Sequence, residues 1–195
     1  MTDRIPAIVA ESLEVKRQFF DAHAMDVQHA SEMIATAFNA GGKLLAFGNG
    51  GSAADAQHIV GELVNRFLQN RRALPAVALT TDGGVLTCIA NDTGFENVFA
   101  RQIEALGAKG DVCLAISTSG TSPNVVVACE RARAQEMKVI GLLGRDGGSV
   151  ASLCDLALIV PSPDTQRIQE THNLVGHILC ELVEQELFPV QNRSR

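Results

Sequence analysis

Aromatic residues are scarce in this sequence: it has no tryptophan and no tyrosine, and aromatics make up only 4% of its 195 residues. Proteins that bind single-stranded nucleic acid rely on aromatic side chains on which the bases stack. The formal net charge is −6, and no run of Lys or Arg is long enough to follow a phosphate backbone. The composition therefore argues against direct nucleic-acid binding.

Closely spaced cysteine pairs are also missing. The five cysteines lie far apart, without a CxxC motif, and each sits in an apolar stretch: Cys88, Cys113, Cys129, Cys154 and Cys180. An odd number of cysteines without disulfide spacing is typical of a reducing compartment, where free cysteine packs as a small hydrophobic residue. The pattern predicts thiols rather than disulfides.

Long apolar segments are absent as well. No run of 18 apolar residues occurs, so the sequence predicts no membrane span. The N-terminal stretch MTDRIPAIVAESLEVKRQFF lacks the apolar core and small-residue cleavage site of a signal peptide. Together with the cysteine pattern, these absences predict a cytoplasmic protein.

The chain does contain an ordinary globular balance, with 46% hydrophobic and 19% charged residues, which excludes wholesale disorder. Its length suits one α/β domain with a sizeable core. We find no internal repeat, low-complexity segment or linker. The sequence therefore predicts a single domain over residues 1–195, with N-terminal helices over 1–40 and a core over 41–190.

Short apolar runs alternate with segments of helical length after residue 41. The runs that predict strands are residues 44–47, 76–79, 112–116, 139–143 and 156–160. Such alternation is typical of a parallel sheet with helices on both faces, and near-continuous apolar runs indicate strands buried on both sides. We therefore predict an α/β fold: a three-layer αβα sandwich around a five-stranded parallel sheet.

Helical spacing of apolar residues marks the two ends of the chain. It predicts helices over the first 40 residues, the second of which ends at Gly41-Gly42. It also predicts one long last helix over residues 164–187, capped by Asp164 or Thr165. A polar tail follows over residues 191–195.

Two polar loops follow predicted strands, at the sheet edge where parallel sheets bind ligands. Residues 48–52, GNGGS, offer flexible backbone and amides at a helix N-terminus, which suit an anion. Residues 117–122, STSGTS, offer five hydroxyls and several amides around one turn, the chemistry of a monophosphate cradle without a metal. Taken alone, each loop also fits a polar turn with a helix cap.

Two pairs of polar side chains share a helix face. His58 and Glu62 are four residues apart, so they can hold a divalent metal or act as a base and its partner. Gln169 and His177 lie eight residues apart on the last helix. Taken alone, the first pair also fits a helical surface pair, and His177 a core histidine. Asn91-Asp92 by itself reads as a turn in a connecting segment.

Six motifs, in this order and spacing, carry a resemblance: GNGGSAADAQH, LPAVALTTD, IANDTGFENVFARQ, GDVCLAISTSGTSPNVV, GLLGRDGG and RIQETHNLVGHILCELVE. They resemble the SIS (sugar isomerase) domain family, and within it the sedoheptulose-7-phosphate isomerases of bacterial heptose synthesis. The resemblance covers nearly the whole chain and implies a flavodoxin-like αβα fold. It also implies the isomerisation of sedoheptulose 7-phosphate to D-glycero-D-manno-heptose 7-phosphate through an enediol, the first step of heptose synthesis for glycans such as the lipopolysaccharide core.

The resemblance also implies roles for single residues. The residues it implies for the sugar phosphate are Ser117, Thr118, Ser119 and Ser122. Those it implies for the rest of the substrate are Asn49, Gly50, Gly51, Ser52, Glu62, Asn91, Asp92 and Gln169. Glu62 and His177 match the catalytic base and acid, and four residues match the zinc ligands of some members: His58, Glu62, Gln169 and His177. A homotetramer is implied as well, with the N-terminal helices at its core and active sites between subunits.

The resemblance leaves an alternative. Non-enzymatic SIS proteins that bind a replication-initiator protein share the QH and RIQE segments and an LFP-type tail, present here at residues 187–189. They tend to lose the glutamate after QH, whereas this chain keeps Glu62 with His58 and His177, so the enzyme is favoured. Sugar-phosphate-sensing regulators usually carry a DNA-binding domain, for which this length leaves no room. Gly83-Gly84 and Thr121 depart from common family residues near the sugar site.

Overall fold

The computed structural model describes residues 4–189, so the polar tail at 191–195 and position 190 of the predicted core lie outside the described residues. The elements in chain order are α1 (Arg4–Asn39), β1 (Leu44–Gly48), α2 (Gly51–Val64), β2 (Ala76–Ala78), α3 (Gly83–Thr93), the 3-10 helix η1 (Phe95–Asn97), α4 (Ala100–Leu106), β3 (Val112–Ser117), α5 (Pro123–Ala134), β4 (Lys138–Gly144), α6 (Gly148–Ala151), β5 (Leu156–Val160) and α7 (Thr165–Leu187).

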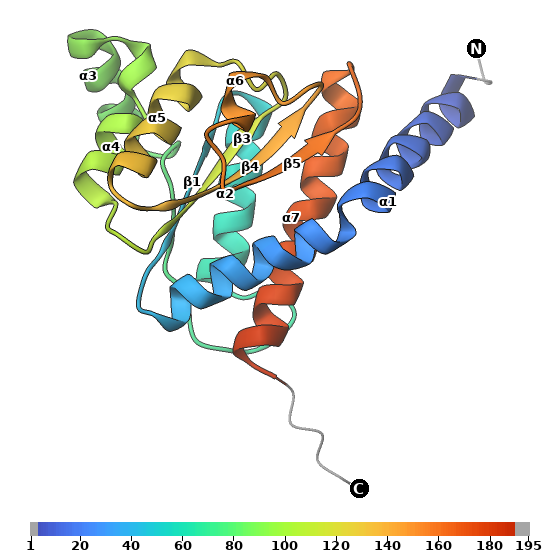
Figure 1. Cartoon of the computed structure of the whole chain (residues 1–195), viewed down its shortest axis with the longest axis horizontal. Coiled ribbons are helices and arrows are strands. Elements are labelled where there is room, and N and C mark those ends of the chain that lie inside the picture. Colours follow the sequence, from blue (N-terminus) through green and yellow to red (C-terminus); the bar gives the residue numbers. More distant parts are fainter. Residues whose placement is uncertain (1–3, 190–195) are drawn as a thin grey trace, which may run out of the picture.

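One five-stranded sheet organises the chain, in the order β2-β1-β3-β4-β5, with every neighbouring pair parallel. Figure 1 shows the strands running side by side with helices around them. The predicted α/β fold with a parallel sheet is confirmed, and β5 has the predicted bounds. The predicted second strand ends one residue early, at Ala78.

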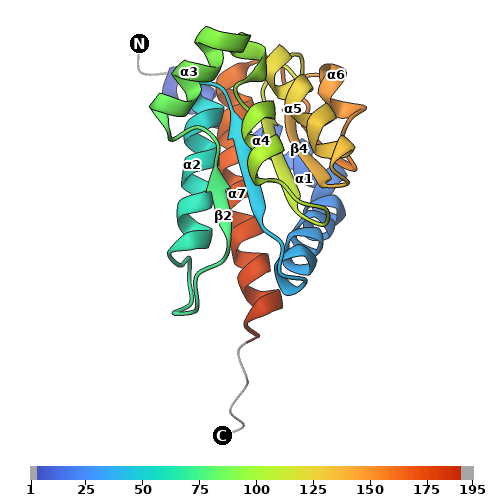
Figure 2. The same ribbon diagram turned by 90° about the vertical axis from the view of Figure 1, so that its left-hand side faces the viewer.

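Alternating strand residues feed two separate cores. Leu44 and Ala46 point into the core beneath α1, α2 and α7, whereas Leu45 and Phe47 point into the core beneath α3, α4 and α5. Figure 2 shows the two helical layers with the sheet between them. Because both faces are covered, β1 and β3 are buried along their whole length, as their apolar sequences predict.

The N-terminal segment corrects one expectation. It forms a single helix, α1, of 36 residues rather than two helices. Residues 7–40 contain neither Gly nor Pro, so nothing interrupts the helix before the positive-φ Gly41. The first half of α1 extends beyond the body of the molecule (Figure 1). Its apolar residues there are exposed: Ile5, Ile8, Val9 and Leu13.

Two further expectations are corrected. Asn91-Asp92 lies within the last turns of helix α3, not in a turn, because Gly94, with φ +99°, ends the helix only two residues later. Cys113, Cys129 and Cys180 are buried as small hydrophobic residues, but Cys88 is exposed on α3.

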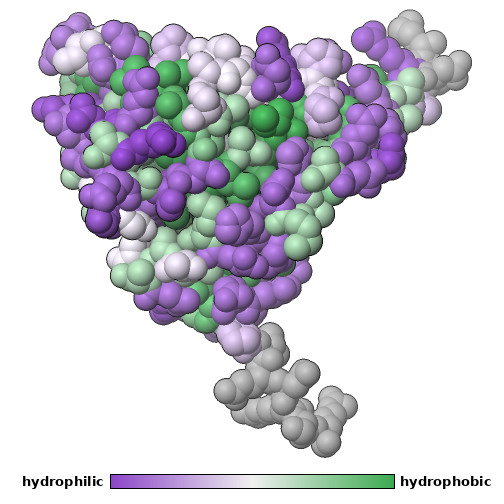
Figure 3. Space-filling view, in the orientation of Figure 1, coloured by the Kyte–Doolittle hydropathy of each residue, from purple (hydrophilic) through white to green (hydrophobic). Residues whose placement is uncertain are grey.

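The outer surface carries apolar area as well as charge. Figure 3 shows hydrophobic side chains in the middle of one face, where the edge strand β5 lies. Leu156, Ala157 and Ile159 of this strand are only half-buried. Among residues 4–189, no helix combines the length and apolar character needed to cross a membrane.

Candidate active site

A small polar pocket opens at the carboxyl ends of β1 and β3. Its volume is about 180 Å³. The residues that line it are Asn49, Ser52, Ile116, Ser117, Thr118, Ser122, Thr165 and Gln169. Pockets that enclose a drug-sized ligand hold roughly 300–1,000 Å³. This pocket therefore suits one polar end of a ligand, and we call it the cradle.

The hydroxyl loop is shaped by its own hydrogen bonds. The Ser117 hydroxyl oxygen accepts from the Gly120 N–H at 3.1 Å, and the Ser119 oxygen accepts from the Thr121 N–H at 3.3 Å. Ser122 stands at the N-cap of α5, but its side chain makes no capping bond. The reading of this loop as a simple helix cap therefore does not account for its hydroxyls, whereas the N-terminus of α5 suits an anion.

An amide pair joins the two loops. Asn49 donates to the Asn124 side-chain oxygen at 2.9 Å, and Asn124 donates back to Asn49 at 2.8 Å. Asn124 is buried in the first turn of α5, and Asn49 follows β1. These reciprocal bonds hold the glycine loop and the hydroxyl loop at a fixed separation.

A second group of polar side chains lies between α2 and α7. His58 Nε2 is 3.3 Å from Glu62 Oε1 and 3.3 Å from His177 Nε2. His58 and Glu62 occupy successive turns of α2, and His177 approaches them from α7. We call these three residues the acid–base cluster. Residues that are 119 positions apart in the sequence meet here.

The cluster is oriented by its neighbours. Asn173 Nδ2 lies 3.3 Å from His58 Nδ1, so the other ring nitrogen of His58 faces Glu62 and His177. Asp55, one turn before His58 on α2, has its pKa raised by burial against the lowering effect of His58. His177 has a neighbour of its own: the Phe67 ring stacks on it, with centroids 5.6 Å apart and planes at 22°. Each ring of the cluster is thus held on more than one side.

The donor set of the cluster fits a divalent metal. Two imidazole nitrogens and one carboxylate oxygen lie within 4.8 Å of one another. Ligands at roughly 2.0–2.2 Å around a tetrahedral ion are about 3.3–3.6 Å apart, which matches both 3.3 Å separations. Two histidines and one glutamate with an open fourth position are typical of a catalytic zinc site. The chemistry of the residues therefore fits a metal without assigning its identity.

The structure separates some of the expected site residues. Gln169 packs against Gly51 and lines the cradle, about 12 Å along α7 from His177 at 1.5 Å per residue. Its role as a fourth metal ligand stays a prediction. Asn91 and Asp92 are exposed and hydrogen-bonded to each other, and within residues 4–189 neither bonds to the cradle or the cluster. Their substrate role likewise stays a prediction.

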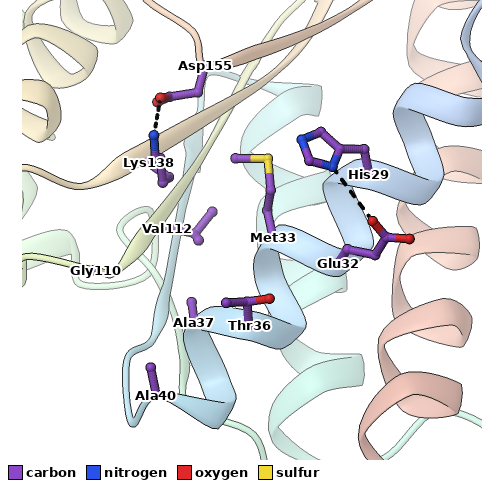
Figure 4. Close-up of a pocket in the computed structure, with 10 residues that line it drawn as sticks. All are labelled: His29, Glu32, Met33, Thr36, Ala37, Ala40, Gly110, Val112, Lys138 and Asp155. Atoms are coloured by element: carbon purple, nitrogen blue, oxygen red, sulfur yellow. Dashed lines mark hydrogen bonds and ion pairs between the residues drawn. The ribbon is translucent and has the colours of Figure 1, made fainter.

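A larger hollow than the cradle lies elsewhere in the molecule. Its volume is about 650 Å³, and it lies at the amino ends of the strands, between α1 and the beginnings of β3 and β4 (Figure 4). Met33, Ala37 and Val112 give it an apolar wall, and the Lys138–Asp155 ion pair closes one side. It contains neither a hydroxyl loop nor the three-residue cluster, so its size alone does not make it the site of chemistry.

Some neighbours of the site were not found from the sequence. Asn124 pairs with Asn49, and Phe67 covers His177. Asn173 orients His58. Asn124 and Asn173 stand within two of the six motifs, so the sequence held a signal for them, whereas Phe67 lies outside every motif.

Comparisons with known proteins agree with this geometry. The SIS domain family model matches residues 9–144. A phosphoheptose isomerase of Pelobacter propionicus is 53% identical over 184 residues, which span 92% of this chain and 97% of that protein. Solved phosphoheptose isomerases of Neisseria gonorrhoeae (44% identity, TM-score 0.90) and Francisella tularensis (38% identity, TM-score 0.91) each match 94% of this chain and 98% of theirs.

Proposed function

Because this chain belongs to the SIS domain family, and its similar relatives are phosphoheptose isomerases over nearly their full length, we propose that it is a phosphoheptose isomerase. It converts sedoheptulose 7-phosphate to D-glycero-D-manno-heptose 7-phosphate, an aldose–ketose isomerisation and the first step of heptose synthesis. The observation that carries the proposal is the meeting of Glu62 and His177 from two helices, one of which, α7, also lines the anion cradle.

The cradle binds the phosphate, which takes no part in the reaction. The hydroxyls of Ser119 and Ser122 and the amides at the start of α5 provide donors for its oxygens. Binding energy from this remote group orients the carbonyl end of the sugar. A ligand anchored there can extend along α7 toward His177, past Gln169.

The acid–base cluster moves the protons. A Glu62 carboxylate oxygen removes the proton from the carbon beside the carbonyl and returns it to the neighbouring carbon after the enediol forms. His177 moves protons on and off the sugar oxygens and assists ring opening. Asn173 and Phe67 keep the imidazoles in place during these transfers. A divalent metal held by His58, Glu62 and His177 would polarise the carbonyl and its adjacent hydroxyl.

The same proposal extends to cofactor, assembly and location. We propose zinc, one ion per subunit, because nitrogen and oxygen donors at tetrahedral spacing suit it. A homotetramer is supported by the exposed apolar side chains of the projecting half of α1, Ile5, Ile8, Val9 and Leu13. A cytoplasmic location is supported by the buried thiols of Cys113, Cys129 and Cys180. No nucleic-acid or membrane partner is proposed.

The test is turnover of sedoheptulose 7-phosphate by the purified protein, with and without added zinc, followed by the appearance of the aldoheptose 7-phosphate. Glu62→Gln and His177→Ala should each lower kcat by about 10²–10⁴, the usual contribution of general acid–base catalysis. KM should change little, because the phosphate cradle is intact in both variants.

A matched histidine–glutamate pair provides the control. His29 and Glu32 lie 3.7 Å apart on α1, away from the cradle and the cluster. His29→Ala and Glu32→Gln should leave kcat and KM unchanged. Absence of turnover in the wild type, or full turnover in Glu62→Gln and His177→Ala, contradicts the proposal. Stable co-purification with an initiator protein and no turnover would instead favour the binding protein.

A further inference from the structure

A buried ion pair lies just below the acid–base cluster. Glu184 is two helical turns beyond His177 on α7, and Arg71 lies in the loop that follows α2. Arg71 Nε donates to Glu184 Oε1 at 2.8 Å, and the two side chains are only 2% and 1% exposed. Such a pair is expensive to bury, and replacing a buried pair by apolar residues is often neutral or stabilising. Stability alone therefore does not explain why the chain keeps this pair.

The glutamate holds the loop that leaves α2. Its carboxylate accepts three consecutive backbone N–H groups, from Phe67 at 2.8 Å, Leu68 at 2.9 Å and Gln69 at 2.9 Å. Burial by itself raises the pKa of Glu184, but these three bonds and Arg71 outweigh it and lower the pKa. The carboxylate is thus ionised and saturated with donors, which fixes the backbone of residues 67–69.

The arginine holds the end of α2. Its Nη2 donates to the Glu62 carbonyl at 2.9 Å, and its Nη1 donates to the Leu63 carbonyl at 2.8 Å. Carbonyls in the last turn of a helix have no partner within the helix, so Arg71 supplies what the helix lacks. The turn that it caps is the turn that presents the Glu62 side chain to the cluster.

Both halves of the cluster therefore depend on this pair. Arg71 fixes the backbone of Glu62, and Glu184 fixes the backbone of Phe67, whose ring stacks on His177. The Phe188 ring lies over the guanidinium of Arg71, with 5.8 Å from Cζ to the ring centroid, and shields it. We propose that the Arg71–Glu184 pair is a positioning device that sets the geometry of Glu62 relative to His177. This inference rests on the proposed function, in which those two residues transfer protons.

Arg71→Lys and Glu184→Gln test the device. Lysine cannot supply the fork that reaches Glu184 and both carbonyls, and glutamine presents an N–H₂ group to backbone donors. In each variant we expect kcat to fall about tenfold or more, since a displacement of about 1 Å can cost a hundredfold. KM should change by less than about threefold, because the cradle that binds the remote phosphate is untouched.

The structure offers a matched control at the amino end of strand β3, away from the carboxyl ends where the cradle lies. Asp111 is a buried carboxylate that accepts the backbone N–H groups of Lys43 and Ala108, each at 2.9 Å, and the Lys43 ammonium. Asp111→Asn removes a buried carboxylate of the same kind without touching α2 or α7, although its partner Lys43 is 30% exposed. It should lower the midpoint of thermal unfolding as Glu184→Gln does, while kcat stays at the wild-type value.

A nuclear magnetic resonance measurement separates positioning from general loss of stability. The Phe67 ring current shifts the His177 imidazole signal, which is assigned as the one of the five histidine signals that His177→Ala removes. In Arg71→Lys and Glu184→Gln this signal should move and the His172 signal should stay, whereas Asp111→Asn should move neither. This readout needs no substrate, so it also tests the device if sedoheptulose 7-phosphate is not turned over.

Three outcomes would overturn the inference: an unchanged kcat in both pair variants, a His177 signal that does not move, or an equal kcat loss in Asp111→Asn. If Glu184→Gln does not fold, Phe67→Leu tests the same step, because it removes the stacked ring and leaves both charges in place. Its kcat should fall, whereas its His177 signal moves in any case because the ring itself is lost; a wild-type kcat in Phe67→Leu would overturn the inference.

Discussion

The cradle and the acid–base cluster are built in different ways, although both lie on α7. The cradle consists of two short loops at the ends of β1 and β3 together with Thr165 and Gln169 of α7, and the bonds within the hydroxyl loop span two or three residues. The cluster consists of side chains on two helices, and the contacts that align those helices join residues more than 110 positions apart. The proposed phosphate site is thus shaped mainly by local bonds, with the Asn49–Asn124 pair as its long-range link, whereas the proposed proton chemistry depends on long-range packing throughout.

This difference predicts two kinds of defect. Changes in the cradle should raise KM and leave kcat largely intact, because they weaken binding of a group that does not react. Changes in the helix pair should lower kcat and leave KM largely intact, because they displace groups that act in the transition state. Variants that move both parameters together would show that the two regions are not separable.

Gly120→Ala should have the largest effect on the cradle. Gly120 has φ +65°, and a Cβ atom there would lie 2.0 Å from the Gly147 carbonyl oxygen, which is backbone and cannot rotate away. The loop must change shape, which removes about two hydrogen bonds to the phosphate and raises KM about a hundredfold. Initial-rate kinetics measure this, and the inhibition constant of inorganic phosphate should rise in parallel.

Gly110→Ala is the control for backbone strain. Gly110 has φ +89° but no atom within 4 Å of a Cβ placed there, and it lies at the edge of the sheet opposite the cradle. The Gly110→Ala variant should have a lower free energy of unfolding than the wild type and an unchanged KM. A folded Gly120→Ala protein with wild-type KM would show that the hydroxyl loop does not bind the phosphate.

His172 lies on α7 between Gln169 of the cradle and His177 of the cluster, and it predicts a dependence of stability on pH. It is buried on α7, and its Nε2 lies 2.9 Å from the carbonyl of Leu143, the β4 residue in register with Ser117. Burial lowers the pKa of His172 from 6.5 to about 4, against the opposing effect of that bond. Between those values the unfolded chain binds a proton that the folded chain does not, so stability is lost as pH falls from 6.5 toward 4.

The loss attributable to His172 should be roughly 2 kcal/mol between pH 7 and pH 5, at 1.36 kcal/mol per pKa unit. Urea unfolding at both pH values measures it. His172→Gln can still donate to Leu143 but does not titrate, so its stability should fall less over the same range. Equal losses in the wild type and His172→Gln would show that the histidine is not kept neutral by the fold.

Local sequence signals account for most of the fold and for the cradle. Uninterrupted apolar runs predict β1, β3, β4 and β5 within one or two residues, because strands buried on both faces need apolar side chains throughout. The hydroxyl loop and the glycine loop follow from the same reasoning, since ligands of parallel sheets bind where strands end. The prediction of a turn at Asn91-Asp92 is wrong. Polar residues shortly before a glycine are typical of a turn, but here Gly94 ends helix α3 and the two residues belong to its last turns.

The support of the acid–base cluster is different. Arg71 and Glu184 are ordinary charged residues in a polar loop and on a long helix, and their pairing spans 113 positions. Glu184 ends the last of the six motifs, but Arg71 lies in none, and no sequence pattern predicts their contact, which follows from how α2 and α7 pack on the sheet. The residues proposed to do the chemistry are found by motif, but finding the residues proposed to align them needs the tertiary structure.

Gly176→Ala should give the smallest effect and probes that packing directly. Gly176 precedes His177, and a Cβ atom there would lie 2.8 Å from both Cγ1 and Cδ1 of Ile59, the neighbour of His58 on α2. Alanine therefore pushes α2 and α7 apart by roughly 0.6 Å, the shift that brings a 2.8 Å contact to 3.4 Å, because a side chain that is 5% exposed has little room to yield. We expect kcat to fall about threefold to fivefold, and about 1 kcal/mol of helix propensity gained from alanine to offset the packing strain.

Ile59→Ala makes this prediction specific. The double variant Gly176→Ala with Ile59→Ala removes both clashing atoms, so its kcat should recover toward the wild-type value even though the new cavity lowers stability. Gly61→Ala is the matched helical control, since it faces open space on α2 and should leave kcat unchanged. Recovery of kcat at the expense of stability would show that helix spacing limits the proton transfers. If kcat instead followed stability across these variants, the helix pair would support the site only by holding the fold together.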